Sequence, residues 1–118
     1  MQPVITLCGS TKFKDDFLDV AKYLGEQGYL VISVTTFTHA DDIITSDEMR
    51  AMLDAIHMQK IIMSDSIYVI NKDGYIGEST LREIAFAGVM KKEIIFHEKP
   101  YKQVIGMLGK LEAHWIFE

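Results

Sequence analysis

Short runs of apolar, largely β-branched residues alternate along this chain with longer segments whose apolar residues recur at helical spacing. This alternation constrains the fold most strongly, because strands separated by helices pair in parallel and leave both sheet faces to be covered by helices. Strands buried on both faces read as continuous apolar runs. The expected strands are Val4 to Cys8, Tyr29 to Val34, Ser66 to Ile70 and Glu93 to His97.

Four helices are expected, one after each strand, from apolar residues spaced three or four apart. Right-handed crossovers between neighbouring strands favour the strand order 2-1-3-4. The apolar tail from His114 to Glu118 is expected to pack on the body or on a neighbouring molecule. The helical stripes are Phe13, Phe17, Val20, Ala21 and Leu24; Met49, Met52, Leu53 and Ile56, continuing to about Met63; Leu81, Ile84, Ala85, Gly88 and Val89; and Val104, Ile105, Leu108 and Leu111.

Residues that cap helices mark the expected ends of these segments. Ser10 or Thr11 is expected to cap the first helix, and Gly28 to end it. A capping box of Thr45 and Glu48 is expected to begin the second helix. The methionines of that helix, Met49 and Met52, are expected to lie in the core.

Composition excludes several classes of protein. The 118 residues suit one domain spanning the whole chain, and the net charge of −5 argues against binding duplex nucleic acid. Cys8 is the single cysteine, so no internal disulfide is possible and a reducing cytoplasm is the expected location. No secretory signal is recognisable, and no apolar stretch approaches the roughly 20 residues that span a bilayer.

Two loops rich in glycine and hydroxyl residues follow the first and third expected strands. The first is Cys8-Gly9-Ser10-Thr11-Lys12, and the second runs from residue 71 to 80. The strand order places both beside the topological switch point, where open α/β sheets bind ligands. Helix N-termini there would attract anions. Neither loop has the spacing of a Walker A or dinucleotide motif, so simple capping and phosphate binding both remain open.

Glu83 lies near the expected start of the third helix and has two interpretations. With Thr80 it forms a T-x-x-E capping box, in which its carboxylate would only bond the main chain of Thr80. Alternatively, the helix dipole keeps it ionised in the first turn, and it attacks the anomeric carbon of a sugar, as the nucleophile of a retaining glycosidase does.

The stretches LCGSTK, SDSIYVI and GESTLREIAFA resemble the nucleoside 2-deoxyribosyltransferase superfamily, which includes the 2'-deoxynucleoside 5'-phosphate N-hydrolases. The resemblance covers roughly Val4 to Phe96. It implies a flavodoxin-like, doubly wound parallel sheet of four or five strands in the order 2-1-3-4(-5), with Glu83 as nucleophile. It also implies a homodimer or higher oligomer whose active sites are partly built by a neighbouring subunit. The G-x-S-T-x-x-E stretch is similar, too, to that of the cytokinin-activating phosphoribohydrolases.

Two positions depart from that family. His57 stands eight residues before Asp65, where the family usually has a catalytic Asp, and Gly77 stands where the transferases have another. His57 could protonate the departing base or be a surface histidine. Asp54 could orient His57 or face water, and Asp65 is expected to hydrogen bond at a strand start.

The resulting hypothesis is cleavage or transfer of the N-glycosidic bond of a 2'-deoxynucleoside or its 5'-monophosphate, without a metal or redox cofactor. The alternatives are a phosphoribohydrolase acting on ribonucleotides and a non-catalytic nucleotide-binding module. A metal site at His39, Asp41 and Asp42 is disfavoured, and Phe37 or Tyr75 could stack on a base. The expected catalytic residues are Glu83 and His57, and the expected substrate-binding residues are Cys8, Gly9, Ser10, Thr11, Lys12, Gly77, Ser79 and Thr80.

Overall fold

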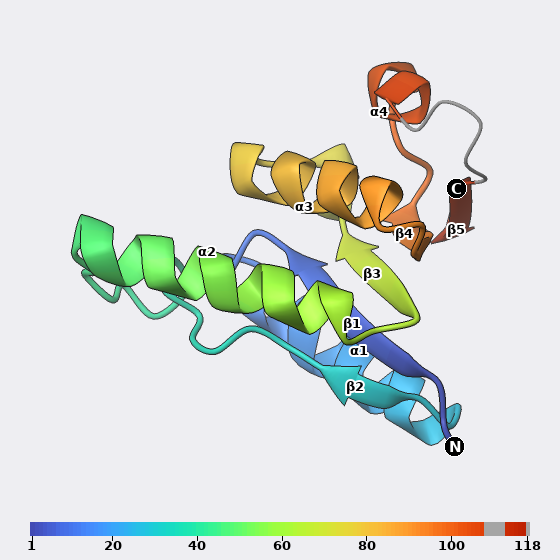
Figure 1. The fold of residues 1–118 in the computed structure, drawn as a ribbon, viewed down its shortest axis with the longest axis horizontal. Coiled ribbons are helices and arrows are strands. Elements are labelled where there is room, and N and C mark those ends of the chain that lie inside the picture. The colour runs from blue at the N-terminus through green and yellow to red at the C-terminus, as the bar shows by residue number, and fades with distance from the viewer. Residues whose placement is uncertain (108–112, 118) are drawn as a thin grey trace.

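The computed structural model describes residues 1–107 and 113–117 and contains a five-stranded, all-parallel sheet (Figure 1). The strand order is β2-β1-β3-β4-β5, which confirms the predicted fold. The strands are β1 (Val4–Gly9), β2 (Leu30–Ile32), β3 (Ser66–Ile70), β4 (Glu93–Glu98) and β5 (Ala113–Phe117). The helices are α1 (Lys14–Glu26), α2 (Asp47–Ile62), α3 (Glu78–Val89) and α4 (Lys102–Met107), and a 3-10 turn, η1 (Lys72–Gly74), follows β3.

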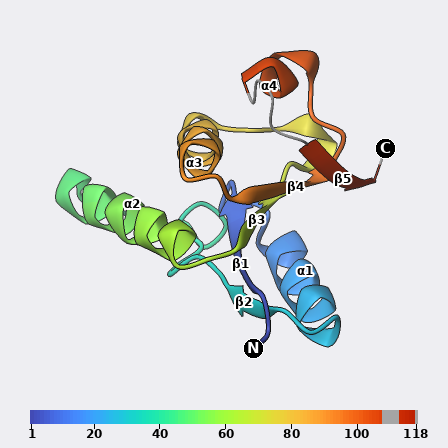
Figure 2. The same ribbon diagram turned by 45° about the vertical axis from the view of Figure 1, so that its right-hand side comes forward.

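Helices cover both faces of the sheet, with α1 on one face and α2 and α3 on the other (Figure 2). Side chains of β1 point alternately to the two faces of the sheet. Ile5 and Leu7 pack with α1, whereas Cys8 packs with Ile61 of α2 and Ile84 of α3. All of these side chains are fully buried. The interior strand β1, between β2 and β3, is therefore buried on both faces, as the sequence predicted.

The C-terminal tail forms the fifth strand. Residues Ala113–Phe117 pair in parallel with β4, so that Trp115 lies opposite Phe96. Trp115 also packs against the core cluster that includes Ile94 and Phe96. The expectation that this tail packs on the body is confirmed. The last helix contains the predicted Val104 and Ile105, whereas Leu108 and Leu111 lie outside the described residues.

The predicted N-caps of the first two helices are wrong, whereas Gly28, with φ of +97°, follows the end of α1 as predicted. Helix α1 begins after Phe13 without a side-chain cap, because Ser10 accepts the Phe13 N–H through its main-chain oxygen at 3.1 Å. Helix α2 is capped by Ser46, whose hydroxyl accepts the Met49 N–H at 3.1 Å, rather than by Thr45. The start of α1 is therefore fixed by a main-chain hydrogen bond, and the start of α2 by the hydroxyl group next to the predicted one. In each case the sequence contains two adjacent hydroxyl residues that could serve as the cap.

The expectation that Met49 and Met52 lie in the core is also wrong. Their exposed fractions are 42% and 50%, and Ile56 on the same helix is 38% exposed. The residues of α2 that are buried are His57 and Ile61. The outward face of α2 is therefore apolar. None of the helices within residues 1–107 and 113–117 is both long enough and apolar enough to cross a membrane.

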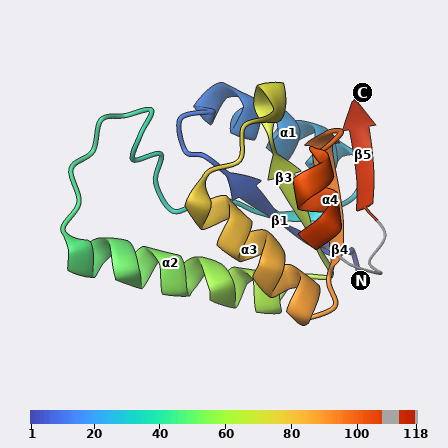
Figure 3. The same ribbon diagram turned by 90° about the horizontal axis from the view of Figure 1, so that it is seen from above.

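The carboxyl ends of β1 and β3 lie side by side, with Gly9 opposite Ile70. Gly9 has φ of +148°, and a Cβ atom there would lie 2.8 Å from the Ile70 carbonyl oxygen. Only glycine fits this close approach. Seen from above, the connection after β2 runs out beyond the sheet to reach the start of α2 (Figure 3). This long connection and the two glycine-rich loops surround the end of the sheet.

Candidate active site

A pocket of about 590 Å³ lies at the carboxyl ends of β1 and β3, between the start of α3 and one face of α2. This volume lies within the range of small-molecule sites. The pocket is at the edge of the sheet that the topological argument predicted. Residues that the sequence predicted and that line it are Gly9, Ser10, Thr11, His57, Gly77, Ser79, Thr80 and Glu83.

Two predicted substrate-binding residues are not part of this wall. Cys8 is fully buried beneath the pocket, at the end of β1. The Nζ atom of Lys12 lies 3.5 Å from the ring centroid of Tyr75, in a cation–π contact. Tyr75 itself lines the pocket and is 47% exposed. Lys12 therefore contacts Tyr75, which lines the pocket, and does not itself line it.

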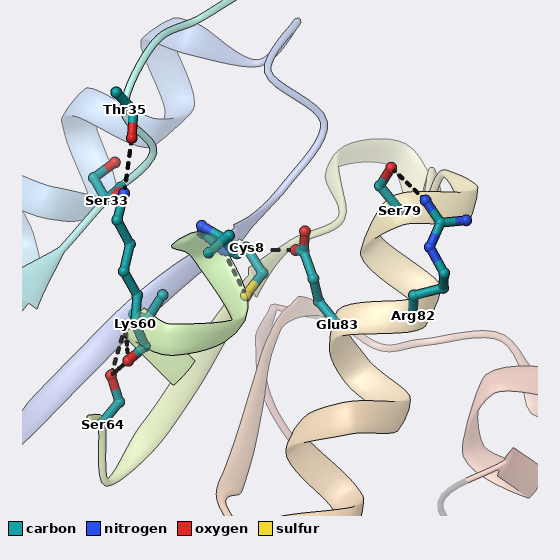
Figure 4. Close-up of polar contacts among 10 residues, drawn as sticks. Cys8, Ser33, Thr35, Lys60, Ser64, Ser79, Arg82 and Glu83 are labelled. Atoms are coloured by element: carbon teal, nitrogen blue, oxygen red, sulfur yellow. Dashed lines mark hydrogen bonds and ion pairs between the residues drawn. The ribbon is translucent and has the colours of Figure 1, made fainter. Parts of the chain in front are cut away.

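Glu83 points from α3 toward Cys8 and into the pocket (Figure 4). Helix α3 begins at Glu78 after Gly77, without a side-chain cap, so Thr80 and Glu83 both lie inside the helix. The predicted Thr80–Glu83 capping box is therefore wrong, and Glu83 belongs to the second turn rather than the first. Its side chain is 12% exposed, so one of its edges reaches the cavity while most of it is desolvated.

Burial raises the pKa of Glu83 to about 7, which corrects the expectation that the helix dipole keeps it ionised. A hydrogen bond with Cys8 lowers this pKa, the negative charge of Asp54 raises it, and the charge of Arg82 lowers it. Desolvation prevails because Glu83 is a full turn inside the helix, where the dipole has little effect. At neutral pH the carboxyl group is near its midpoint, so a large fraction of Glu83 is ionised there.

His57 is buried against Glu83, and the surface-histidine interpretation is wrong. Its Nε2 atom lies 3.5 Å from Cys8 Sγ and 3.7 Å from Glu83 Oε1. Burial lowers the pKa of His57 to about 4, the charge of Lys60 lowers it as well, and a hydrogen bond with the Leu7 main chain raises it. The imidazole is therefore neutral at pH 7, and it holds no imidazolium proton to give to a departing base.

Cys8 completes a compact group at the pocket floor. One ligand atom from each of Cys8, His57 and Glu83 lies within 4.8 Å of the other two. Burial raises the pKa of the Cys8 thiol well above its ordinary value, and the charge of Glu83 raises it further. Without a bound cation the thiol stays protonated. From the sequence, Cys8 was expected to be a core or substrate-binding residue, and its position beside His57 and Glu83 was not predicted.

Hydroxyl and charged side chains fix the loops around the mouth. Thr11 Oγ1 lies 2.9 Å from His39 Nδ1 and accepts the His39 N–H at 3.1 Å. Asp41 pairs with Lys14 at 2.9 Å. These partners tie the β2–α2 connection to the first loop and to the start of α1, so His39 and Asp41 have structural roles. Phe37 packs edge-to-face on Phe17, with ring centroids 5.6 Å apart, and is a core aromatic residue.

Asp65 acts as a strand-start residue, as predicted. Its Oδ2 atom accepts the Val4 N–H at 2.8 Å. This bond lies at the opposite end of β1 from the pocket, so Asp65 is not a candidate catalyst.

Two cations that line the pocket, Arg50 and Lys60, were not predicted from the sequence, and Asp54 was not expected in its wall. Arg50, Asp54 and Lys60 all contribute to the wall from α2. They share a face with His57, since residues three or four apart on a helix are neighbours. Lys60 Nζ donates to the Ser33 carbonyl oxygen at 2.8 Å and to Thr35 Oγ1 at 3.2 Å (Figure 4). The sequence feature that could have identified these pocket residues is a stripe of polar residues at helical spacing in α2.

Comparison with known proteins identifies solved structures with this fold. No family model and no curated protein sequence matches the chain. A 2-deoxyribosyltransferase from the psychrotolerant bacterium Bacillus psychrosaccharolyticus matches with TM-score 0.71 and 16% identity over 98% of this chain and 86% of its own. A CMP N-glycosidase from Clostridium botulinum matches with TM-score 0.65 and 19% identity, over 98% and 88%. The chain therefore shares the fold of these two enzymes, which is the fold that the resemblance implied.

Proposed function

We propose that the protein cleaves or transfers the N-glycosidic bond of a 2'-deoxynucleoside or its 5'-monophosphate. The observation that carries this proposal is the Glu83 carboxyl group, which borders a pocket of nucleotide size while being largely desolvated. The fold is that of two enzymes named for acting on such bonds, a 2-deoxyribosyltransferase and a CMP N-glycosidase. No metal is part of this mechanism.

The reaction proceeds in two displacements at C1'. A Glu83 carboxylate oxygen attacks C1', the C1'–N bond breaks, and its electron pair leaves with the base, which takes up a proton. Water or a second base then attacks C1' and gives up one proton to solvent, and the ester C–O bond breaks to restore the carboxylate. The absence of a 2'-OH eases formation of positive charge at C1', which lowers the barrier of both steps.

His57 has a positioning role in this mechanism. Its neutral ring lies 3.7 Å from Glu83 Oε1 and hydrogen bonds with the Leu7 main chain, so it holds the carboxyl group toward the pocket. The base takes its proton from solvent in the open pocket. This assignment replaces the prediction that His57 protonates the leaving base.

The 5' end of the substrate is proposed to lie by Ser10, Thr11, Ser79 and Thr80. All four line the pocket, and the first N–H groups of α3 have no partner within the helix. Arg50 and Lys60 add positive charge to the wall. The combination suits a 5'-phosphate. Lys12 is still proposed to help bind the 5' end. Its ammonium group would act from its position over the Tyr75 ring.

Ribonucleotide hydrolysis is the second candidate function. One structural relative is named for cleaving CMP, which is a ribonucleotide. The two functions differ in whether the pocket accepts a 2'-OH.

The test is a panel of deoxyribo- and ribonucleosides and their 5'-monophosphates, assayed for free base with a chelator present. Glu83→Ala is assayed beside Glu93→Gln, which removes a carboxylate at the amino end of β4, far from the pocket. We expect base release from deoxyribonucleotides, abolished in Glu83→Ala and kept in the control. Release from ribonucleotides alone supports the second candidate. Nucleotide binding without release by the wild type leaves a non-catalytic binding module.

The chain is further proposed to form a homo-oligomer through α2. Met49, Met52, Ile56 and Met63 present an apolar face, with exposed fractions from 38% to 69%. A second copy seated there would lie next to the wall formed by Arg50 and Asp54. Sedimentation analysis is expected to show a dimer or larger assembly, and Met52→Glu is expected to dissociate it. A wild-type monomer at micromolar concentration would contradict this proposal.

A further inference from the structure

Three side chains that are common metal ligands converge at the floor of the pocket from three separate elements. They are Cys8 at the end of β1, His57 in α2 and Glu83 in α3. The Sγ–Nε2 distance is 3.5 Å and the Nε2–Oε1 distance is 3.7 Å. Within residues 1–107 and 113–117, no other group of His, Cys, Asp and Glu comes together in this way.

The Sγ–Nε2 and Nε2–Oε1 distances are close to those of a tetrahedral metal site, and the three ligand atoms all lie within 4.8 Å of one another. Zinc binds sulfur at about 2.3 Å and nitrogen or carboxylate oxygen at about 2.0–2.2 Å. Two such ligands at a tetrahedral angle lie roughly 3.4–3.6 Å apart. A cation between Sγ, Nε2 and Oε1 would draw the three side chains closer together from separations of at most 4.8 Å.

We propose that Cys8 Sγ, His57 Nε2 and a Glu83 carboxylate oxygen form a binding site for a divalent transition metal of the zinc type. The sulfur and imidazole ligands favour Zn²⁺ and Co²⁺ over Mg²⁺ and Ca²⁺, which take oxygen ligands. His57 and Glu83 line the pocket, so the metal has a path of entry, and its fourth position faces the cavity. Three protein ligands with one open position are typical of reactive zinc sites.

The surroundings preorganise the ligands. The hydrogen bond between His57 and the Leu7 main chain orients the ring, as contacts of this kind do for most metal-binding histidines. On binding, the Cys8 S–H bond breaks, the sulfur–metal bond forms, and the proton passes to the buffer. A Glu83 carboxyl group that carries a proton releases it in the same way. No electron is transferred, and no other reactant is required.

Metal binding and glycosidic chemistry compete for the same carboxylate. An oxygen of Glu83 that is bound to the metal is withdrawn from attack on C1'. The metal-bound protein is therefore inhibited, and chelation restores activity. This consequence rests on the proposed function, whereas metal binding itself does not.

Cobalt(II) provides the direct probe, because thiolate ligation gives a charge-transfer absorption band in the near ultraviolet. Metal-free protein is titrated with Co²⁺ and then with Zn²⁺, without substrate. We expect one Co²⁺ per chain, a thiolate band, and displacement by Zn²⁺ but not by Mg²⁺. Cys8→Ser abolishes the band. Glu83→Gln and His57→Gln weaken binding by more than about tenfold.

His39→Gln is the matched control, since His39 lines the same pocket but is outside the trio. It is expected to bind Co²⁺ as the wild type does. Circular dichroism checks that each variant is folded. Folded wild-type protein that gives no thiolate band at micromolar Co²⁺ overturns the proposal whatever the variants do, as does binding that persists in both Cys8→Ser and Glu83→Gln.

The two proposals fail in distinguishable ways. If the protein binds metal but the metal-free protein, assayed with a chelator, releases no base, the glycosidic function is rejected and the metal site is retained. Base release without metal binding does the reverse. If both occur, stoichiometric Zn²⁺ is expected to suppress base release, and a chelator is expected to restore it.

Discussion

His57 Nε2 lies 3.7 Å from Glu83 Oε1, and both side chains are largely excluded from water. The distance is that of an ion pair, but burial lowers the pKa of His57 to about 4 and raises the pKa of Glu83 to about 7. Between these two pH values the imidazole is neutral and the carboxyl group is mostly protonated. The pair is therefore uncharged in mildly acidic solution, and near pH 7 the charge that develops is that of Glu83 alone.

Base release by metal-free protein is expected to rise with pH through about 7. The ionised form of Glu83 is the nucleophile, and its pKa of about 7 sets the rising limb of the profile. The measurement is kcat/KM for the best substrate between pH 5 and 9, with a chelator present. A rate that is constant or falls across pH 6–8 would contradict the role of Glu83.

The two buried groups make opposite contributions to the pH dependence of folding stability. The pKa of Glu83 is raised on folding, so its favourable contribution is complete below its ordinary value of 4.5 and is lost as pH rises through about 7. The pKa of His57 is lowered on folding, so its contribution is complete above 6.5 and is lost as pH falls through about 4.

Variants that keep only one group are expected to separate these contributions. Between pH 4.5 and 6.5, the free energy of unfolding of Glu83→Gln should rise with pH relative to wild type, and that of His57→Gln should fall. Urea unfolding of metal-free protein across this range provides the measurement. Parallel slopes for the two variants would show that the groups are not buried as described.

Gly9→Ala is expected to destabilise the fold by about 1–3 kcal/mol, because the residue has a strained φ and its new methyl group meets the Ile70 carbonyl oxygen. Gly25→Ala is the matched control. Gly25 lies inside α1 with open space around it, so alanine should stabilise the fold by about 0.5–1 kcal/mol. Urea denaturation compares the two, and equal effects would reject the close approach of β1 to β3.

Much of the fold could be predicted because β1 and β3 are continuous apolar runs and the helices between strands force parallel pairing. β5 was harder to predict. It follows a helix of six residues at a sheet edge, and its apolar sequence indicated only that the tail packs on the body or on a neighbouring molecule. Helix ends were the least predictable, since Ser10, Thr11, Thr45 and Ser46 offer equivalent hydroxyl groups and only the path of the chain decides between them.

The site was only partly predictable because α2 reverses the usual amphipathic pattern. Its outward face carries Met49, Met52 and Ile56, while Asp54 and His57 face the pocket. If the apolar residues of α2 are assigned to the core, the helix is predicted with its outward face turned inward. Such conflicts between local pattern and final structure are typical of functional and interface surfaces. The environment of Glu83 depends on burial by Cys8 and His57, which are distant in sequence, and no local motif encodes it.

Trapping the covalent intermediate tests the central claim most directly. A deoxynucleotide analogue with fluorine at C2' slows both displacements, because the electronegative fluorine opposes positive charge at C1'. Intact-protein mass spectrometry of metal-free enzyme should then show one added fluorodeoxyribosyl phosphate, and peptide analysis should place it on Glu83. Glu83→Gln should carry none. Base release without any adduct on Glu83, or an adduct at another residue, would contradict the account.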